Sequence, residues 1–374
     1  MKYYIIAGEA SGDLHGSNLM KHLKRMDVNA SFRCWGGEKM KAQGATLVKH
    51  INELAFMGFW EVLVNLRTIF KQIRLCKEDI KKWKPDAVIL IDYPGFNLRI
   101  AEYAKTNNIK VIYYISPQLW AWKQSRIKKI KKYVDKMLVI LPFEKDFYEK
   151  FNYNVEFPGH PLIDVIEDEK KKIEANSNFL IINDLPKKPI VAILPGSRKI
   201  EISKMLKIMT TVAESFTDYQ FIIAGISSYS PDFYNKFIKK PNVKIVYDQT
   251  YSLLKSSEAA IVTSGTATLE TALFNVPQVV CYKAGKISYS IARRLIKVKY
   301  ISLVNLIMDK LIVKELIQNN FNTYSLKKEI KKILYDRNYR KEITNNYNDM
   351  KYKLGGTGAS ENASNIIYNY LKGE

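Results

Sequence analysis

Residues 85–116 have the sequence PDAVILIDYPGFNLRIAEYAKTNNIKVIYYIS, which predicts a strand, a helix and a second strand. The apolar runs at 86–91 and 110–115 do not alternate polar and apolar residues, as is typical of strands buried on both faces of a parallel sheet. Residues 98–106 between them have a helical pattern. This unit therefore indicates an α/β fold in which helices cover a parallel sheet.

The same alternation of strands and helices occurs on both sides of a charged segment that ends near two prolines. Two successive series of similar size predict two doubly wound α/β domains. We expect a first domain at 1–166, a linker at 167–188, a second domain at 189–340 and C-terminal helices at 341–374. A surface helix within one domain is the other interpretation of 167–188. Further strands are predicted at 2–7, 136–141, 189–194, 220–224, 243–246, 259–262 and 278–282.

The chain has 374 residues, which exceeds one ordinary hydrophobic core, and a net charge of +22. Such an excess of Lys and Arg predicts an acidic partner, either a nucleic acid, an anionic lipid or a phosphorylated substrate. Three widely separated cysteines argue against a disulfide framework. The N-terminal apolar run is too short for a signal peptide and no stretch is apolar enough to span a membrane, so we expect a cytoplasmic location.

Residues that directly follow strands are the candidates for a site, because ligands of doubly wound folds bind beyond the carboxyl ends of the strands. Asp92 follows a buried strand, where partial desolvation favours a general base. A helix N-cap is the alternative, although Asn97 is better placed for that role. After the first strand, Glu9 would repel a pyrophosphate, so Glu9 and Ser11 belong either to a plain tight turn or to the site of a neutral acceptor group.

The corresponding loops of the second half have the features of a diphosphate site. Arg198 follows a Pro-Gly pair and precedes a helix, where its guanidinium can bind a phosphate; an ion pair with Glu201 is the alternative. The turn at 263–270 offers hydroxyls and backbone N–H groups at the start of a helix, and Glu270 is placed to accept two ribose hydroxyls, unless this is a plain capped helix. The candidates on this side are Arg198, Ser264, Gly265, Thr266 and Glu270.

Three segments combine aromatic or apolar residues with positive charge. Trp120 and Trp122 precede the basic stretch 123–136, and the pair is either a core contact or an interfacial patch for lipid or phosphate. Residues 54–75 form either a helix of the core or a surface that takes up acyl chains from an anionic bilayer. Residues 283–299 are a second basic surface. The candidates for membrane or lipid contact are Phe56, Met57, Phe59, Trp60, Arg67, Lys71, Lys128, Lys129 and Lys132.

Several other classes of site are disfavoured. The Walker pattern is absent, which argues against a P-loop NTPase. The four histidines are isolated from further ligands, so we expect neither a metal nor a cofactor. No RRM, KH or zinc-finger pattern is present, although the charge keeps a basic nucleic-acid-binding protein open as an alternative.

Nine stretches carry a resemblance to a known family. The sequence is similar to lipid-A-disaccharide synthase, a glycosyltransferase family of GT-B architecture with two facing Rossmann-like domains and a cleft between them. The match runs nearly end to end and in the same order. The stretches are AGEASGDLHG at 7–16, ELAFMGFWEVL at 53–63, IDYPGFN at 91–97, SPQLWAWKQSRIKKI at 116–130, LPFEKDFY at 141–148, GHPLID at 159–164, LPGSRKIEI at 194–202, SGTATLETAL at 264–273 and SLVNLIM at 302–308.

The resemblance implies a specific reaction. The family joins UDP-2,3-diacylglucosamine to 2,3-diacylglucosamine 1-phosphate (lipid X), forming the β-1,6-linked lipid A disaccharide 1-phosphate and UDP without a metal, in an inverting transfer. The proposed base of the family falls on Asp92, residues of the UDP side on Arg198 and Asn305, and a glutamate near the ribose on Glu270. The resemblance also implies peripheral attachment to the inner face of the cytoplasmic membrane of a Gram-negative bacterium. Members can form homodimers that exchange C-terminal segments, so 341–374 either packs back on the N-terminal domain or is exchanged.

The chain departs from the family pattern at three positions. The second acid of the IDxPDFN motif is Gly95 here, so the base rests on Asp92 alone. His15 and Val304 replace the commoner apolar residue and proline, with no functional consequence attached. A UDP-sugar epimerase of the same architecture is the alternative enzyme, and it would need no lipid acceptor.

Overall fold

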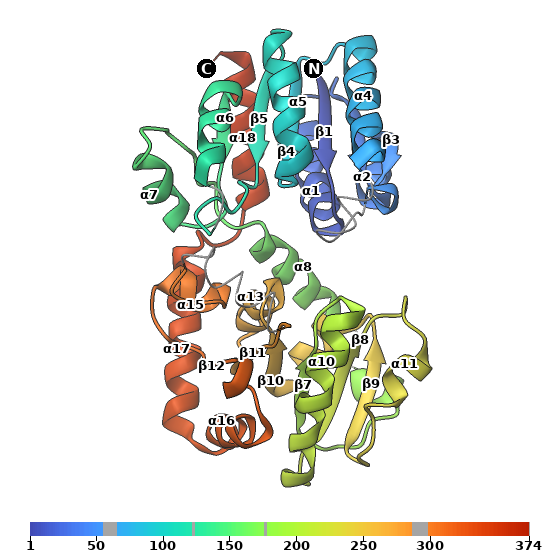
Figure 1. Cartoon of the computed structure of the whole chain (residues 1–374), viewed down its shortest axis with the longest axis vertical. Helices are drawn as coiled ribbons and strands as arrows, with labels where there is room; N and C mark the ends of the chain where they lie inside the picture. The colour runs from blue at the N-terminus through green and yellow to red at the C-terminus, as the bar shows by residue number, and fades with distance from the viewer. Residues whose placement is uncertain (55–65, 122–123, 176–177, 286–297, 374) are drawn as a thin grey trace. The chain divides into compact units, whose positions relative to one another are not determined.

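The computed structural model describes residues 1–54, 66–121, 124–175, 178–285 and 298–373. The chain forms two compact units, the first from Met1–Pro161 with Leu354–Glu374 and the second from Leu162–Lys353. Each unit contains a six-stranded parallel sheet flanked by helices (Figure 1). The α/β class predicted from the sequence is thereby confirmed.

The sheet of the first unit has the order β3-β2-β1-β4-β5-β6. The order reverses between β1 and β4, which pair in parallel so that Ala7 lies opposite Ile91. The loops that follow these two strands therefore leave the same edge of the sheet, at the position where doubly wound folds bind ligands. The strands are β1 (Lys2–Ala7), β2 (Ser31–Gly36), β3 (Thr46–His50), β4 (Ala87–Ile91), β5 (Lys110–Tyr114) and β6 (Lys136–Leu138).

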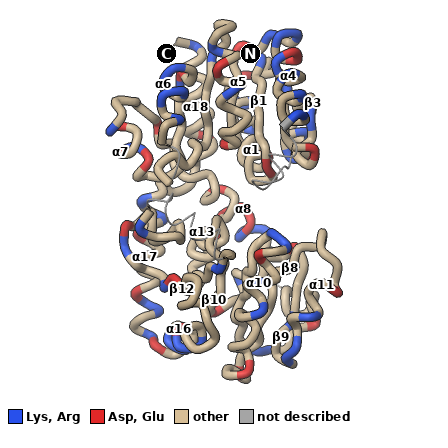
Figure 2. Tube along the Cα trace, viewed as in Figure 1, with Lys and Arg blue, Asp and Glu red and all other residues tan. Residues whose placement is uncertain are grey.

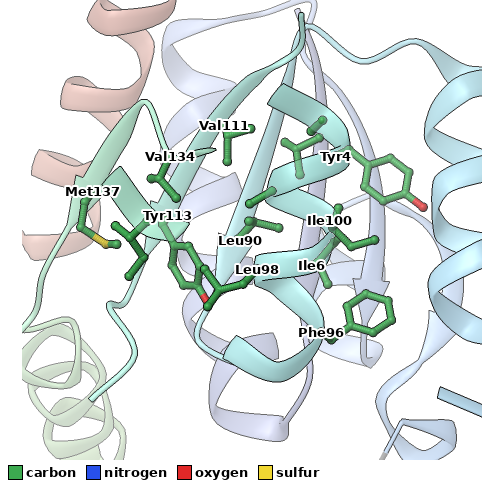
Figure 3. Close-up of a cluster of buried hydrophobic side chains, with 14 of the residues drawn as sticks. Tyr4, Ile6, Leu90, Phe96, Leu98, Ile100, Val111, Tyr113, Val134 and Met137 are labelled. Carbon is green, nitrogen blue, oxygen red and sulfur yellow. The ribbon is translucent and has the colours of Figure 1, made fainter. Parts of the chain in front are cut away.

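Helices cover both faces of this first sheet. On one face α4 (Leu66–Trp83), α5 (Pro94–Thr106) and α6 (Ile127–Tyr133) lie side by side. Their core includes strand side chains and the apolar residues of α5 (Figure 3). On the other face α1 (Ala10–Met26) packs against α18 (Ala359–Lys372). Shorter elements are α2 (Glu38–Ala42), α7 (Phe143–Glu149) and the 3-10 helices η1 (Ile51–Glu53) and η2 (Gln124–Arg126).

The second unit repeats this arrangement with the order β12-β11-β10-β7-β8-β9. Its order reverses between β7 and β10, where Leu194 lies opposite Val262. The loops that carry Arg198 and Ser264 follow these two strands, so they also leave one edge of their sheet. The strands are β7 (Ile190–Leu194), β8 (Gln220–Gly225), β9 (Val243–Tyr247), β10 (Ser257–Thr263), β11 (Gln278–Tyr282) and β12 (Glu315–Ile317).

The boundaries of the units differ from those expected from the sequence. Residues 167–175 of the segment expected as a linker lie in α8 (Leu162–Ala175), which packs on α12 (Thr250–Lys255) and α13 (Thr266–Leu273) of the second unit. Lys170 donates a hydrogen bond of 2.9 Å to the carbonyl of Leu273, so charged residues of α8 join the unit instead of spacing it. Of the C-terminal helices, α17 belongs to the second unit and α18 to the first. The helices of the second unit are α8 (Leu162–Ala175), α9 (Phe179–Ile182), α10 (Lys199–Met209), η3 (Thr210–Ser215), α11 (Pro231–Asn235), α12 (Thr250–Lys255), α13 (Thr266–Leu273), α15 (Leu303–Met308), η4 (Gln318–Asn320), α16 (Thr323–Tyr335) and α17 (Arg337–Lys353).

Candidate active site

Asp92 and Tyr93 form a left-handed turn between β4 and α5. Their φ angles are 43° and 46°, a conformation that costs non-glycine residues about 1–2 kcal/mol each. Three hydrogen bonds hold the turn. The hydroxyl of Tyr113 and the side-chain amide of Asn97 both donate to the carbonyl of Asp92, at 2.5 and 2.7 Å, and the Asp92 N–H donates to the carbonyl of Ile115 at 3.2 Å. The backbone of Asp92 is therefore fixed at the ligand-binding edge of the first sheet.

The loop after β1 lies against this turn. The ring of Tyr93 covers Gly8 so closely that a Cβ atom at residue 8 would lie 2.4 Å from the ring. Only glycine fits beneath it, which explains the glycine that directly follows β1. Glu9 follows directly, exposed at the N-terminus of α1, and Ser11 is exposed in the first turn of that helix.

Asp92 has the electrostatic properties of a general base. Its side chain reaches solvent, but the surrounding protein limits the hydration of the carboxylate. This desolvation, together with the negative charge of Glu9, raises the pKa of Asp92 from 3.8 to about 6, against a smaller opposing effect of the Tyr93 backbone N–H. A carboxylate with a pKa near 6 is mostly ionised at neutral pH and still a useful proton acceptor.

Two other candidate residues of this unit, Asn97 and Trp120, form hydrogen bonds within the protein. Asn97 is fully buried, and its amide also donates to the carbonyl of Ile91 at 3.2 Å, so it stabilises the turn instead of capping a helix. Trp120 is half-buried and donates from Nε1 to a carboxylate oxygen of Glu144 at 3.2 Å. Trp122 lies outside the described residues.

Sequence reasoning missed two buried acids in the first unit. Asp13 accepts hydrogen bonds from the backbone N–H groups of Gly37, Lys39 and Met40, so its carboxylate caps α2. Glu144 accepts from the backbone N–H groups that precede α7, and burial raises its pKa to about 7. Both acids lie inside the motif stretches quoted above, but their contacts depend on long-range packing that no local pattern encodes.

In the second unit, the loop after β7 leaves Arg198 exposed at the N-cap of α10. Gly196 has a φ of 98°, and a Cβ there would lie 2.5 Å from a carboxylate oxygen of Glu201. Glycine is therefore required here, because its φ angle is positive and because the Glu201 side chain leaves no room for a Cβ atom. Among the described residues Arg198 and Glu201 form no ion pair, and burial raises the pKa of Glu201 against the opposing effects of the Arg198 charge and of a hydrogen bond from the Arg198 backbone. The guanidinium is accordingly available to a ligand.

The loop after β10 forms an open helix N-terminus. Gly265 is the N-cap of α13, and a Cβ atom there would meet nothing within 4 Å. Thr266 is exposed in the first turn, where backbone N–H groups lack partners inside the helix and suit a phosphate. The hydroxyl of Ser264 donates to the carbonyl of Ile301 at 2.8 Å, so this loop is tied to the segment before α15.

Glu270 lies one turn into α13, half-buried. Its Oε1 accepts a hydrogen bond of 2.8 Å from the hydroxyl of Tyr251. Burial raises the pKa of Glu270, whereas the bond from Tyr251 opposes that rise. Tyr251 thus orients one carboxylate oxygen.

One known protein family matches nearly the whole chain. The model of the family described as lipid-A-disaccharide synthetase matches residues 3–368. The chain belongs to this family. The lipid-A-disaccharide synthase of Syntrophus aciditrophicus (strain SB) is 39% identical over 375 residues, with 98% of this chain and 97% of the relative covered. The synthase of Coxiella burnetii (strain CbuG_Q212) is 37% identical over 371 residues, with 98% of each chain covered.

Solved structures confirm the GT-B-like architecture of this synthase family member. The UDP-GlcNAc 2-epimerase from Neisseria meningitidis, solved with bound UDP-GlcNAc, has a TM-score of 0.70 at 14% identity and covers 100% of both chains. The calicheamicin glycosyltransferase has a TM-score of 0.62 at 16% identity, covering 99% of this chain and 98% of its own. At such identities the two structures share the fold alone. The family and the relatives support the synthase prediction, an enzyme of glycosyl transfer, over the epimerase.

Asn305, a residue predicted for the UDP side, is fully buried. Its amide donates to the carbonyl of Val313 and to Glu315, both at 2.9 Å, and its oxygen accepts from the N–H groups of Ile312 and Val313. The same Glu315 accepts from the N–H of Ile301, whose carbonyl binds Ser264. Asn305 therefore holds the segment that supports the Ser264 loop.

The structure describes only some of the residues that are predicted to contact the membrane or lipid. Arg67 and Lys71 are exposed on α4, and Lys128, Lys129 and Lys132 on α6. Figure 2 shows Lys and Arg along both helices, which flank α5 on one face of the first sheet. We call this surface the α4–α6 face. Phe56, Met57, Phe59, Trp60 and residues 286–297 lie outside the described residues.

In the described ranges no helix has the length and apolar character that crossing a bilayer requires. In the same ranges no three His, Cys, Asp or Glu side chains are grouped as a metal site would need.

Proposed function

We propose that this chain transfers 2,3-diacylglucosamine from UDP to 2,3-diacylglucosamine 1-phosphate, with inversion, to give the β-1,6-linked lipid A disaccharide 1-phosphate and UDP. Membership of the lipid-A-disaccharide synthase family supports the substrates. The observation that carries the mechanism is Asp92, a carboxylate with a pKa of about 6 at the strand-order reversal of the first sheet.

In the proposed reaction Asp92 acts as the general base. It accepts the proton of the primary hydroxyl of the acceptor while that oxygen attacks the anomeric carbon of the donor. The bond from the anomeric carbon to the UDP oxygen breaks, and its electron pair leaves with UDP. Attack opposite the leaving group inverts the configuration. General-base assistance of this kind supplies roughly 10²–10⁴-fold in rate.

The second unit is proposed to bind the donor. Arg198 and the open N-terminus of α13 at Gly265 and Thr266 offset the negative charge that develops on the diphosphate. Glu270 accepts hydrogen bonds from the ribose hydroxyls with the carboxylate that Tyr251 orients. Preformed donors of this kind stabilise the transition state because they need no reorganisation during the reaction.

We also propose that the protein works at the inner face of the cytoplasmic membrane. Both substrates carry acyl chains and phosphate groups, and the net charge of +22 favours an anionic surface. On the α4–α6 face, Phe70 is 56% and Leu75 43% exposed among basic residues of α4. Flotation with vesicles of phosphatidylglycerol and of phosphatidylcholine tests this surface, since Arg67→Glu with Lys71→Glu should weaken binding to the former only. The homodimer stays a prediction, which sedimentation measurements test.

The experiment that tests the reaction is an assay with purified protein, the two acylated sugars and no added divalent metal. We expect equal amounts of UDP and disaccharide, with Asp92→Asn at least about 100-fold slower but still able to bind UDP. Near-normal turnover by Asp92→Asn would remove Asp92 from the role of base. Consumption of UDP-GlcNAc without an acceptor would instead favour an epimerase, and salt-sensitive RNA binding without UDP affinity a nucleic-acid-binding protein.

A further inference from the structure

We propose that Tyr113 is a positioning residue for the reaction, because it holds the peptide group of Asp92 in the orientation that the general base requires. The inference rests on the proposed role of Asp92. Tyr113 lies outside the nine stretches that carry the family resemblance, and its ring is fully buried in the core of the first unit. Figure 3 shows it beside Leu90 and Leu98, with the hydroxyl at the far end of the ring.

The pairing of β4 with β5 brings Tyr113 close to Asp92. Tyr113 lies on β5, opposite Leu90 of β4, two residues before the turn. Its hydroxyl reaches the carbonyl of Asp92 at 2.5 Å, so the anchor comes from the rigid sheet. Asn97, in α5, binds the same carbonyl at 2.7 Å and also the carbonyl of Ile91 at the end of β4. Tyr113 thus fixes the turn to the neighbouring strand β5, whereas Asn97 links it to the helix that follows and to its own strand.

These two bonds occupy both lone pairs of one carbonyl oxygen. They fix the plane of the peptide that joins Asp92 to Tyr93, where both residues have left-handed backbone angles. Rotation of that plane would redirect the Cα–Cβ bond of Asp92 and move its carboxylate. Displacement of a reacting group by about 1 Å costs on the order of 100-fold in rate, so a partial loss of this anchor should be visible in turnover.

The first test compares Tyr113→Phe with a matched control, Tyr153→Phe. Tyr153 is in the same unit and its hydroxyl likewise donates to a backbone carbonyl, that of Val134, at 3.0 Å. Each variant loses one hydroxyl and one hydrogen bond of the same type. We expect Tyr113→Phe to lower kcat about 5–10-fold with KM nearly unchanged, and Tyr153→Phe to stay within about twofold, at similar losses in Tm. Equal kcat values in the two variants would overturn the proposal.

The second test repeats the substitution in the Asp92→Asn background. If Tyr113 acts through the carboxylate of Asp92, then Tyr113→Phe should cause no further loss there, within about twofold. A full additional loss in that background would show a purely structural role and overturn the inference. Asn97→Ser, which removes the other donor to the same carbonyl, should show the same dependence on Asp92 if Tyr113→Phe folds poorly.

The two hypotheses fail separately in these measurements. Near-normal turnover by Asp92→Asn contradicts the general base, and the role of Tyr113 falls with it. A slow Asp92→Asn, together with a Tyr113→Phe that behaves like its control, leaves the base in place and contradicts the positioning role alone.

Discussion

Replacement of Glu9 by glutamine should move the acid limb of the pH–rate profile to lower pH. Burial and the charge of Glu9 together raise the pKa of Asp92 from 3.8 to about 6, and burial is the larger cause. The substitution removes only the smaller contribution, so we expect the midpoint to fall by about half a pH unit, and by no more than about one. The perturbation leaves the base itself intact.

The size of the effect follows from the protonation of Asp92. With a pKa of about 6, about one-tenth of the carboxylate is ionised at pH 5 and about nine-tenths at pH 7. The value of kcat/KM at pH 5 should therefore be about tenfold below its plateau. A midpoint lower by half a pH unit raises kcat/KM at pH 5 about 2.5-fold relative to the unsubstituted protein, with little change at pH 7.

The assay is kcat/KM for UDP release between pH 4.5 and 8.5, measured at constant ionic strength. The matched control is Glu149→Gln, because Glu149 is an exposed acid of the same unit that does not contribute to the pKa of Asp92. The 1-phosphate of the proposed acceptor also titrates near pH 6, but its pKa in solution does not respond to a change at Glu9. An acid limb that is identical in Glu9→Gln and Glu149→Gln would refute the reasoning.

Three further predictions concern the second unit. Arg198→Ala should weaken UDP binding about 10–100-fold by calorimetry, as expected for a lost charge-assisted hydrogen bond, and unchanged affinity would refute the diphosphate assignment. Tyr251→Phe removes the hydrogen bond that lowers the pKa of Glu270, so this pKa should rise further. As the pH is lowered, UDP affinity should therefore begin to fall at a higher pH than in the unsubstituted protein. An unaltered pH dependence would contradict ribose binding by the ionised carboxylate. Asn305→Ala should lower the free energy of unfolding by about 2–4 kcal/mol, whereas Asn338→Ala at an exposed site should stay within about 0.5 kcal/mol, and equal Tm values for the two would contradict the scaffold role.

The fold could be predicted from the sequence because its signals are local. Uninterrupted apolar runs such as 87–91 mark strands covered on both faces, and all five residues of this run are buried in β4. The place of Asp92 at the end of a strand could be predicted for the same reason, since it depends only on the strand that precedes it. Motif resemblance then supplied the family, which residues 3–368 confirm.

The remainder could not be predicted because it depends on contacts between distant segments. The charged face of α8 resembled a linker, yet the helix packs on the second unit through residues that are far apart in sequence. The hydrogen bonds of Asn305 to Val313 and Glu315 could not be predicted, because they form only once the segment after α15 has folded back. Tyr113 lies in an ordinary strand pattern, and only the three-dimensional pairing of β4 and β5 brings its hydroxyl to Asp92.

The return of α18 to the first unit has a consequence for biosynthesis. The N-terminus of a chain leaves the ribosome first. The unit Leu162–Lys353 can therefore complete its own sheet and helices while α18 is still in the exit tunnel. Until then Leu19 and Leu23 of α1 lack the cover that Ile367 provides, which leaves an apolar strip open on the nascent protein. Termination at residue 353 should consequently yield an aggregation-prone product, even though every described strand and every candidate site residue has already been synthesised.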